Sequence, residues 1–155
     1  MIIIRDYQPG DGQVLRELYF STVHNINRRD YTRDQLQAWA PDEYDEAAWD
    51  THLQALTPFV AVIDNKVVGY ADLQSDGLID HFFCHHQYQG QGIGRSLMQH
   101  ILEQARQRSV LSLRAYVSIT ARPFFEHVGF QVVKEQQVRL RGQLLTNYRM
   151  ELEIE

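Results

Sequence analysis

The sequence holds a single cysteine, Cys84, so no disulfide can form within the chain. No apolar run approaches the ~20 residues that a helix needs to cross a bilayer, and no charged-then-apolar signal opens the sequence. Acidic and basic residues are interspersed rather than gathered in blocks, with a formal net charge of −5. These features disfavour a nucleic-acid-binding or membrane protein, and we expect a cytoplasmic one.

No internal repeat, low-complexity segment or linker interrupts the 155 residues. A chain of this length buries roughly two-thirds of the surface that it exposes when unfolded, which is enough for a hydrophobic core. The sequence therefore predicts a single domain over residues 1–155.

The N-terminal third is predicted to be one short strand, over residues 1–5, followed by three helices. Asp11, Thr32 and Asp45 are the expected N-caps of these helices, and Pro58 ends the last one. The first helix has apolar or small residues at helical spacing, namely Val14, Leu15, Leu18, Tyr19, Thr22 and Val23.

From residue 59 onward the pattern changes to that of strands, which are predicted over 59–64, 67–73 and 77–84 with a tight turn at Asn65-Lys66. A strand over 111–118 leads to a short helix that Thr120 caps and Gly129 stops. Two closing strands, 131–140 and 143–153, flank a hairpin turn at Arg141-Gly142. The fold class is α/β (α+β).

The most informative stretch is Gln87–Met98. Its three glycines, Gly90, Gly92 and Gly94, lie between an apolar run over 79–84 and an amphipathic segment over 93–105. A strand that turns through glycines into a helix presents unpaired N–H groups at the positive end of the helix dipole. Because glycine has no side chain to keep a phosphate away, this loop predicts an anion cradle, and we expect a pyrophosphate there.

The spacing of the loop separates the candidate systems. A Walker loop needs a lysine after its last glycine, where this chain has Arg95 and Ser96, and a dinucleotide fingerprint needs a different third spacing. Gln89-Gly90-Gln91-Gly92-Ile93-Gly94 instead matches Gln/Arg-x-x-Gly-x-Gly/Ala, the pyrophosphate loop of the GNAT acetyltransferases, which this chain resembles. Nucleotide binding through the same loop is disfavoured.

A second motif supports the resemblance. The segment 118–130 is similar to the family's Asn-x-x-Ala-x-x-Phe-Tyr-x-x-x-Gly-Phe, with Ser118 at the asparagine and Phe125 at the tyrosine. This segment and Tyr7–Asp11 also resemble a bacterial YafP-like branch of small single-domain members. The resemblance implies the GNAT fold, a central mixed but mostly antiparallel sheet flanked by helices.

The resemblance also implies acetyl-CoA as cosubstrate. The segment 82–84 then takes the place where a family strand splays from its neighbour and offers backbone donors to the pantetheine arm and the thioester carbonyl. The cofactor-binding residues implied in this way are Phe82, Phe83, Cys84, Gln89, Gly90, Gln91, Gly92, Ile93, Gly94, Arg95, Ser118 and Phe125.

The catalytic base is expected just upstream of these residues. Only a neutral amine attacks a thioester, and amines are mostly protonated at neutral pH. Strand alternation places Asp80 on the face of Phe82 and Cys84, and the family's base positions fall on that face, so Asp80 is the candidate base. His81, expected on the opposite face, is the alternative.

Phe125 lacks the hydroxyl with which family members often protonate the departing CoA thiolate. A thiol is a tolerable leaving group without full acid help, and Tyr116, Ser118 or a water is the expected substitute. Tyr116 and Asp80 are therefore the candidate catalytic residues.

Two other kinds of site are less favoured. No metal site is expected, because alternation separates His81 from Cys84 and the adjacent His85 and His86 lack tetrahedral geometry. Cys84 has no evident orienting triad for an acyl-enzyme route.

The predicted function is transfer of an acetyl group from acetyl-CoA to a small-molecule or peptide amine in a ternary complex. Some of the aromatic residues Tyr31, Trp39, Tyr44 and Trp49 are expected to line the acceptor pocket. The alternative is an acyl-CoA-binding sensor or regulatory module. No nucleic acid or membrane partner is expected, and the chain is expected to be a monomer or homodimer.

Overall fold

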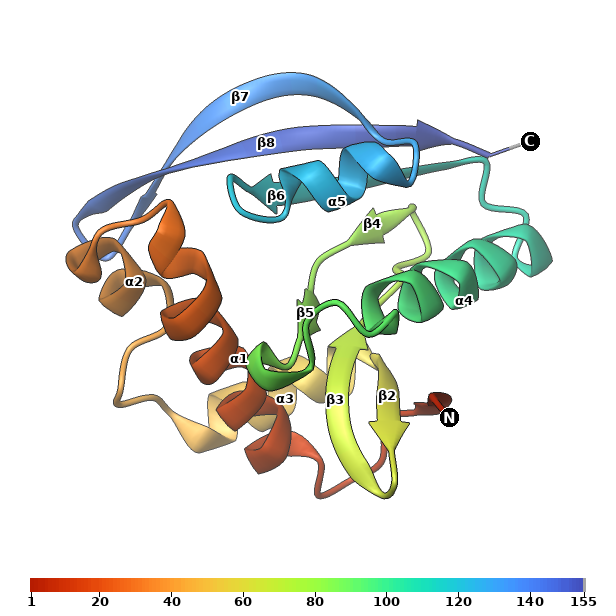
Figure 1. Ribbon diagram of the computed structural model, residues 1–155, viewed down its shortest axis with the longest axis horizontal. Helices are drawn as coiled ribbons and strands as arrows, with labels where there is room; N and C mark the ends of the chain where they lie inside the picture. The colour runs from red at the N-terminus through yellow and green to blue at the C-terminus, as the bar shows by residue number, and fades with distance from the viewer. Residues whose placement is uncertain (155) are drawn as a thin grey trace.

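Two four-stranded sheets and five α-helices make up the computed structural model, which describes residues 1–154 (Figure 1). In strand order, the first sheet consists of β1 (Ile3–Asp6), β2 (Phe59–Ile63), β3 (Lys66–Ala71) and β5 (Phe82–Cys84). The second consists of β4 (Leu78–Ile79), β6 (Ser112–Ser118), β8 (Gln143–Glu153) and β7 (Gln131–Leu140). Only β4 and β6 pair in parallel within the described residues. The mixed, mostly antiparallel arrangement is therefore confirmed.

Three helices gather on the left of Figure 1: α1 (Gly12–Ile26), α2 (Arg33–Trp39) and α3 (Glu46–Leu56). Helix α1 packs against β3 and β5 of the first sheet, whereas α2 contacts β8 of the second. A short 3-10 turn, η1 (Asn27–Arg29), follows α1. Thr32 caps α2 in a full capping box, and Asp45 caps α3 by accepting from the Ala48 N–H at 3.0 Å. The three helices are present as predicted, and so are the caps of α2 and α3.

Asp11 has a different job from the one predicted for it. It immediately precedes α1, but its carboxylate makes no cap hydrogen bond. The carboxylate instead accepts from the Arg5 guanidinium at 2.8 and 2.9 Å and from the Gln8 N–H at 2.8 Å. Asp11 therefore fixes the turn between β1 and α1.

Helix α4 (Ile93–Gln107) packs against the first sheet through one apolar face. Ile93, Leu97, Ile101 and Ala105 are all buried on that face, at the spacing of an amphipathic helix. A 3-10 turn, η2 (His86–Tyr88), and the glycine loop connect β5 to α4. The packing of α4 therefore fixes where the glycine loop ends.

The predicted strand over 77–84 is broken in two. β4 belongs to the second sheet and β5 to the first, so the chain crosses from one sheet to the other at Asp80 and His81. Buried Asp72 explains the crossing: its Oδ1 accepts from the Asp80 N–H at 2.9 Å and from the His81 N–H at 2.7 Å. A side chain thus replaces the strand partner at this point, and the sheets diverge beyond it.

The C-terminal part follows the sequence closely. The hairpin strands β7 and β8 and their turn at Arg141-Gly142 have the predicted bounds, and they arch over α5 (Arg122–His127) and β6 in Figure 1. Ala121, rather than Thr120, precedes α5, and the Ser118 hydroxyl accepts its N–H at 3.0 Å.

The early hairpin turn is also displaced by one residue. Asp64 and Asn65 both have positive φ, and Lys66 already begins β3. Two-residue hairpin turns need such left-handed backbone, which Asn and Asp adopt more readily than most residues.

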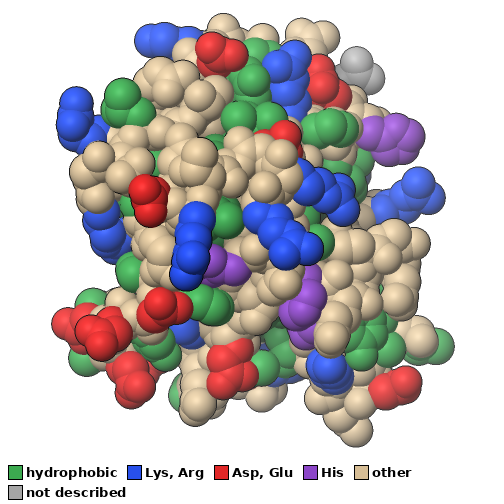
Figure 2. Space-filling model, turned by 60° about the vertical axis from the view of Figure 1, so that its left-hand side comes forward, with side chains coloured by type: hydrophobic (Ala, Val, Ile, Leu, Met, Phe, Trp, Pro, Cys, Tyr) green, Lys and Arg blue, Asp and Glu red, His purple; other side chains and the backbone are tan. Residues whose placement is uncertain are grey.

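Charges are mixed on the surface. On the face in Figure 2, basic and acidic side chains lie interspersed, and several acidic ones gather at the lower left. Within residues 1–154, none of the helices has the length and apolarity required for a bilayer span.

Candidate active site

A cavity of about 560 Å³ lies where the two sheets diverge. β5, the glycine loop, β6 and α5 contribute its walls, together with Asp80 from the crossing. Of the residues predicted from sequence to bind the cofactor or act in catalysis, all but Gln91 line it. Gln91 lies in the loop but points its side chain to solvent.

The glycine loop has two different requirements for glycine. Gly90 (φ +75°) and Gly92 (φ +85°) have left-handed backbone, and a Cβ on either would point into open space. A Cβ on Gly94 would lie 3.2 Å from the Phe124 ring and 3.7 Å from the Cys84 Sγ. The first two glycines shape the turn, and the third lets α4 approach α5.

Gly92 caps α4 with no side chain, and the first turn of the helix holds no acidic residue. The N–H groups of that turn therefore present positive potential beside the cavity, as an anion site requires. The Gln89 amide donates to the carbonyls of Cys84 and His85 at 3.0 and 3.2 Å and holds the other end of the loop. These residues fit a pyrophosphate.

β5 presents its free edge to the same cavity. Phe83 is paired with Tyr70, and the neighbouring ladder bonds run from the Asp72 N–H to the His81 carbonyl and from the His85 N–H to the Val68 carbonyl. Because the ladder alternates, Phe82 and Cys84 turn their N–H groups away from β3. β5 is the last strand of its sheet, so these donors face the gap between the sheets.

A second cavity of about 290 Å³ adjoins the first. Both predicted catalytic residues, Asp80 and Tyr116, border both cavities, as do the predicted cofactor-binding residues Phe83 and Ser118 and also Trp39. Most of the second cavity is apolar or aromatic, with walls that include Tyr19, Tyr31, Leu140 and Leu145. Asp80 is its only carboxylate among the described residues.

The aromatic residues of the first helical region divide between two roles. Tyr31 and Trp39 line the second cavity. Tyr44 and Trp49 instead surround the buried Arg16, whose guanidinium carbon lies 4.2 Å from the Tyr44 ring centre.

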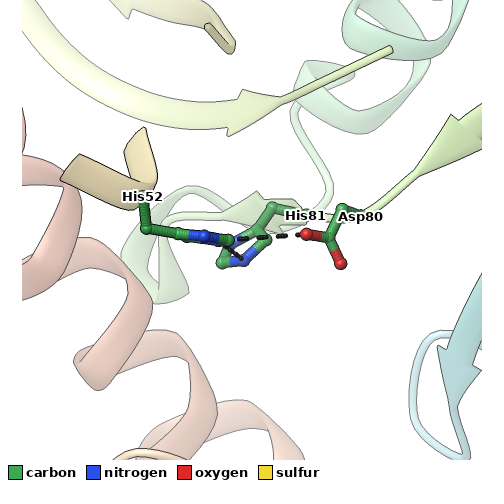
Figure 3. A group of neighbouring side chains, drawn as sticks. All are labelled: His52, Asp80 and His81. Carbon is green, nitrogen blue, oxygen red and sulfur yellow. Dashed lines mark hydrogen bonds and ion pairs between the residues drawn. The ribbon is translucent and has the colours of Figure 1, made fainter. Parts of the chain in front are cut away.

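Asp80 and His81 lie close together, which corrects the prediction that they occupy opposite faces. Strand alternation fails here because the chain changes sheets between them. His52, from α3, joins them: its Nε2 lies 3.3 Å from the His81 Nε2 and 3.8 Å from Asp80 Oδ2 (Figure 3).

His81 is held as a neutral ring. Burial lowers the pKa of His81 to about 4, against the opposing effect of nearby Asp80. Its Nδ1 lies 2.9 Å from the hydroxyl of the fully buried Tyr70. A base with so low a pKa is a weak proton acceptor at neutral pH.

His52 and Asp72 are the residues that sequence reasoning missed. His52 is an exposed residue of a helix distant in sequence. Asp72 was predicted to lie within the strand 67–73, whereas β3 ends at Ala71 and leaves Asp72 just beyond it. Its burial at 0% exposure is the signal of its function, and that signal exists only in three dimensions.

Cys84 is poorly suited to covalent catalysis. Burial raises the pKa of its thiol to about 12, so almost no thiolate exists at neutral pH. Its carbonyl accepts from the Thr22 hydroxyl at 2.9 Å, which ties β5 to α1.

Phe125 is buried at the back of the first cavity. Its ring packs edge-on against Phe82 and Phe130, with ring centres 5.4 and 5.1 Å away. Tyr116 is half-exposed, and it is the tyrosine that borders both cavities.

The family model of the acetyltransferase (GNAT) domain matches residues 27–152. YafP of Escherichia coli K12, named an uncharacterised N-acetyltransferase, is 36% identical over 149 residues, which are 96% of this chain and 94% of YafP. The chain belongs to the GNAT acetyltransferase family. It is an acetyl-CoA-dependent acetyltransferase, and the resemblance read from its two motifs is confirmed.

Solved structures agree with this assignment. A GCN5-related N-acetyltransferase from Rhodopseudomonas palustris has a TM-score of 0.93 and 27% identity, covering 97% of this chain and 94% of its own. The fold is also that of yncA from Salmonella typhimurium, solved with acetyl-CoA (TM-score 0.72, 20% identity, 100% and 95% covered). A PaiA N-acetyltransferase from Thermoplasma acidophilum, solved with coenzyme A, is likewise similar (TM-score 0.76, 16% identity, 99% of each chain).

Proposed function

We propose that this acetyltransferase transfers an acetyl group to a primary amine by direct attack, with both substrates bound at once. The observation that carries the proposal is the meeting of two cavities at Asp80 and Tyr116. The first cavity has an anion cradle and a free strand edge, whereas the second has mainly aromatic and apolar walls.

The first cavity is assigned to acetyl-CoA, which supplies the acetyl group as a thioester when bound. Its pyrophosphate is assigned to the N–H groups of residues 89–95, because the loop offers donors without side chains and α4 begins there. The outward N–H groups of Phe82 and Cys84 are assigned to the pantetheine arm and the thioester oxygen. Backbone donors held in this way stabilise negative charge that develops on that oxygen.

The second cavity is assigned to the acceptor. Its walls favour an amine carried on an apolar or aromatic body, because the buried Tyr19 and Leu145 and the half-buried Leu140 give little polar contact. One carboxylate suffices for one ammonium group. A polyamine or aminoglycoside, with several charges to satisfy, suits this cavity less well.

Asp80 is proposed to accept the proton of the bound ammonium group, directly or through one water. Tyr116 is proposed to return a proton to the departing thiolate, in place of the hydroxyl that Phe125 lacks. His81 stays neutral and orients the acceptor end of the site.

The test is CoA release in a panel of amines that differ in body and charge: phenethylamine, hexylamine, spermidine, an aminoglycoside and a peptide N-terminus. We expect the first two to give the highest kcat/KM. Acetyl-CoA binding without CoA release for any amine would favour the sensor alternative, and preference for spermidine would overturn the assignment of the acceptor.

A further inference from the structure

Three metal-ligating side chains converge at the acceptor end of the site. His52, Asp80 and His81 each offer one ligand atom, and these atoms all lie within 4.8 Å of one another (Figure 3). His52 comes from α3, whereas Asp80 and His81 come from the crossing between the sheets. Of these three residues, only His81 belongs to the group that the sequence pattern had suggested and excluded as a metal site; His52 and Asp80 are new.

The spacing suits a tetrahedral ion. Two imidazole nitrogens bound to zinc at ~2.0–2.1 Å with a tetrahedral angle lie about 3.4 Å apart. The Nε2 atoms of His52 and His81 are 3.3 Å apart and face each other. Asp80 Oδ2 is 3.8 Å from the His52 Nε2, and its side chain, 42% exposed, has room for the small rotation that would complete three ligands.

The ligands are supported from behind. The His81 Nδ1 lies 2.9 Å from the Tyr70 hydroxyl, an arrangement that fixes the ring and leaves Nε2 for an ion. Asp72 holds the backbone N–H groups of both Asp80 and His81. The backbone of Asp80 and His81 and the ring of His81 are therefore held in place whether or not an ion is present.

We propose that His52, Asp80 and His81 bind one divalent transition-metal ion of the zinc class. The ion takes no part in transfer. Because Asp80 is the proposed base and borders both cavities, the bound ion occupies the proton acceptor and inhibits the enzyme. Only this inhibitory consequence rests on the proposed function; binding itself does not.

Binding is tested by calorimetric titration of the purified chain with Zn²⁺ and by the visible absorption of Co²⁺, without amine or acetyl-CoA. We expect one site and a tetrahedral Co²⁺ spectrum. His52→Gln removes an exposed ligand and should weaken binding by at least ~10-fold, as should Asp80→Asn. The matched control is His127→Gln, which removes an exposed histidine from α5 and should leave the affinity unchanged.

Equal affinity of His52→Gln and the wild type, or equal loss in the control, would overturn the site. Circular dichroism of each variant checks that it is folded. Inhibition is tested by initial rates, followed by loss of thioester absorbance because free CoA thiol binds zinc. Half-inhibition near the measured Kd, reversed by EDTA, supports the inhibitory role. A saturated site with an unchanged rate would overturn that role while leaving binding intact.

Discussion

Asp80 borders both cavities, with the His52 Nε2 3.8 Å from its carboxylate. Asp80→Asn keeps the shape of this side chain and removes its proton acceptor. We expect turnover at neutral pH to fall roughly 10²–10⁴-fold. Partial recovery is expected as the pH rises, because more of the free amine then arrives neutral. The measurement is a pH–rate profile with the best amine.

Asp76→Asn is a matched control for that profile. Asp76 is an exposed carboxylate that pairs with Arg114 at 2.8 Å and lines neither cavity. Its variant should follow the wild-type profile. If Asp80→Asn also overlaps the wild type, Asp80 is structural and the proton leaves by another route.

The thiol of Cys84 is not expected to take part in transfer. Burial raises the pKa of its thiol to about 12, so the sulfur is a poor nucleophile at neutral pH. Direct transfer does not use this sulfur. Cys84→Ala should keep substantial activity, with some loss from the removed contact near Gly94. Intact-mass spectra after acetyl-CoA addition give the check: an acetylated Cys84 together with a dead alanine variant would establish the covalent route instead.

Single residues were predictable from sequence where a motif fixes them. The glycine loop and Asp80 lie where the motif and its upstream strand suggested, and both border the cleft. His52 was not predictable, because nothing in an exposed helical histidine indicates which strand it faces. Tyr116 was named only as one of three expected substitutes, with Ser118 and a water, for the hydroxyl that Phe125 lacks.

At the scale of elements, the junction of β5 and α4 depends on the backbone of Gly92. We expect Gly92→Glu to abolish CoA binding in a folded protein, because its side chain and charge occupy the anion site. Gly142→Glu is the control: Gly142 has φ +83° and equally open surroundings, but lies in the β7–β8 turn. This substitution causes the same backbone strain, that of a side chain at positive φ, but places nothing in the cleft. Calorimetry should therefore distinguish the two, and equal CoA affinity in both would exclude the loop.

The crossing between the sheets gives the next prediction. Burial raises the pKa of Asp72 to about 6, from an ordinary value of 3.8. The folded state therefore binds this proton more tightly than the unfolded one. Its contribution to stability is complete below pH ~4, declines as the pH rises towards 6, and is flat above.

Asp72→Asn removes this titration but keeps an oxygen for the two N–H groups. The unfolding free energy of the variant should rise relative to wild type between pH 4 and 6, by on the order of 3 kcal/mol. Asp72→Ala leaves both N–H groups without an acceptor and should destabilise by about 2–4 kcal/mol. Urea unfolding across this pH range measures both. A constant difference between wild type and Asp72→Asn would contradict the assignment.

Elements whose signals are local were predicted well. The capped helices α2 and α3 and the β7–β8 hairpin carry their boundaries in a few adjacent residues. The break between β4 and β5 was not predicted, because it depends on Asp72, eight residues upstream of Asp80. The alternation argument failed at the same place and for the same reason.

For the whole molecule, cofactor binding should couple to stability, since the cleft joins both sheets. A ligand at ~100 times its Kd adds about 2.7 kcal/mol to the unfolding free energy, which for a chain of this size is a rise of about 5–10 °C in Tm. Thermal denaturation with and without CoA checks this. The rise should vanish in Gly92→Glu and persist in Gly142→Glu; its absence in the wild type would argue against the cleft as the cofactor site.

The free edge of β5 has one more consequence. Unpaired strand edges invite other chains to add to the sheet, and proteins normally guard them against aggregation. Here the edge is three residues long and lies in a gap between diverging sheets, with the glycine loop and α5 on either side. A slender, linear molecule can reach it, whereas a second polypeptide strand, with side chains on both faces, is kept out. The same gap that admits the substrate therefore protects this strand edge from pairing with a strand of another chain.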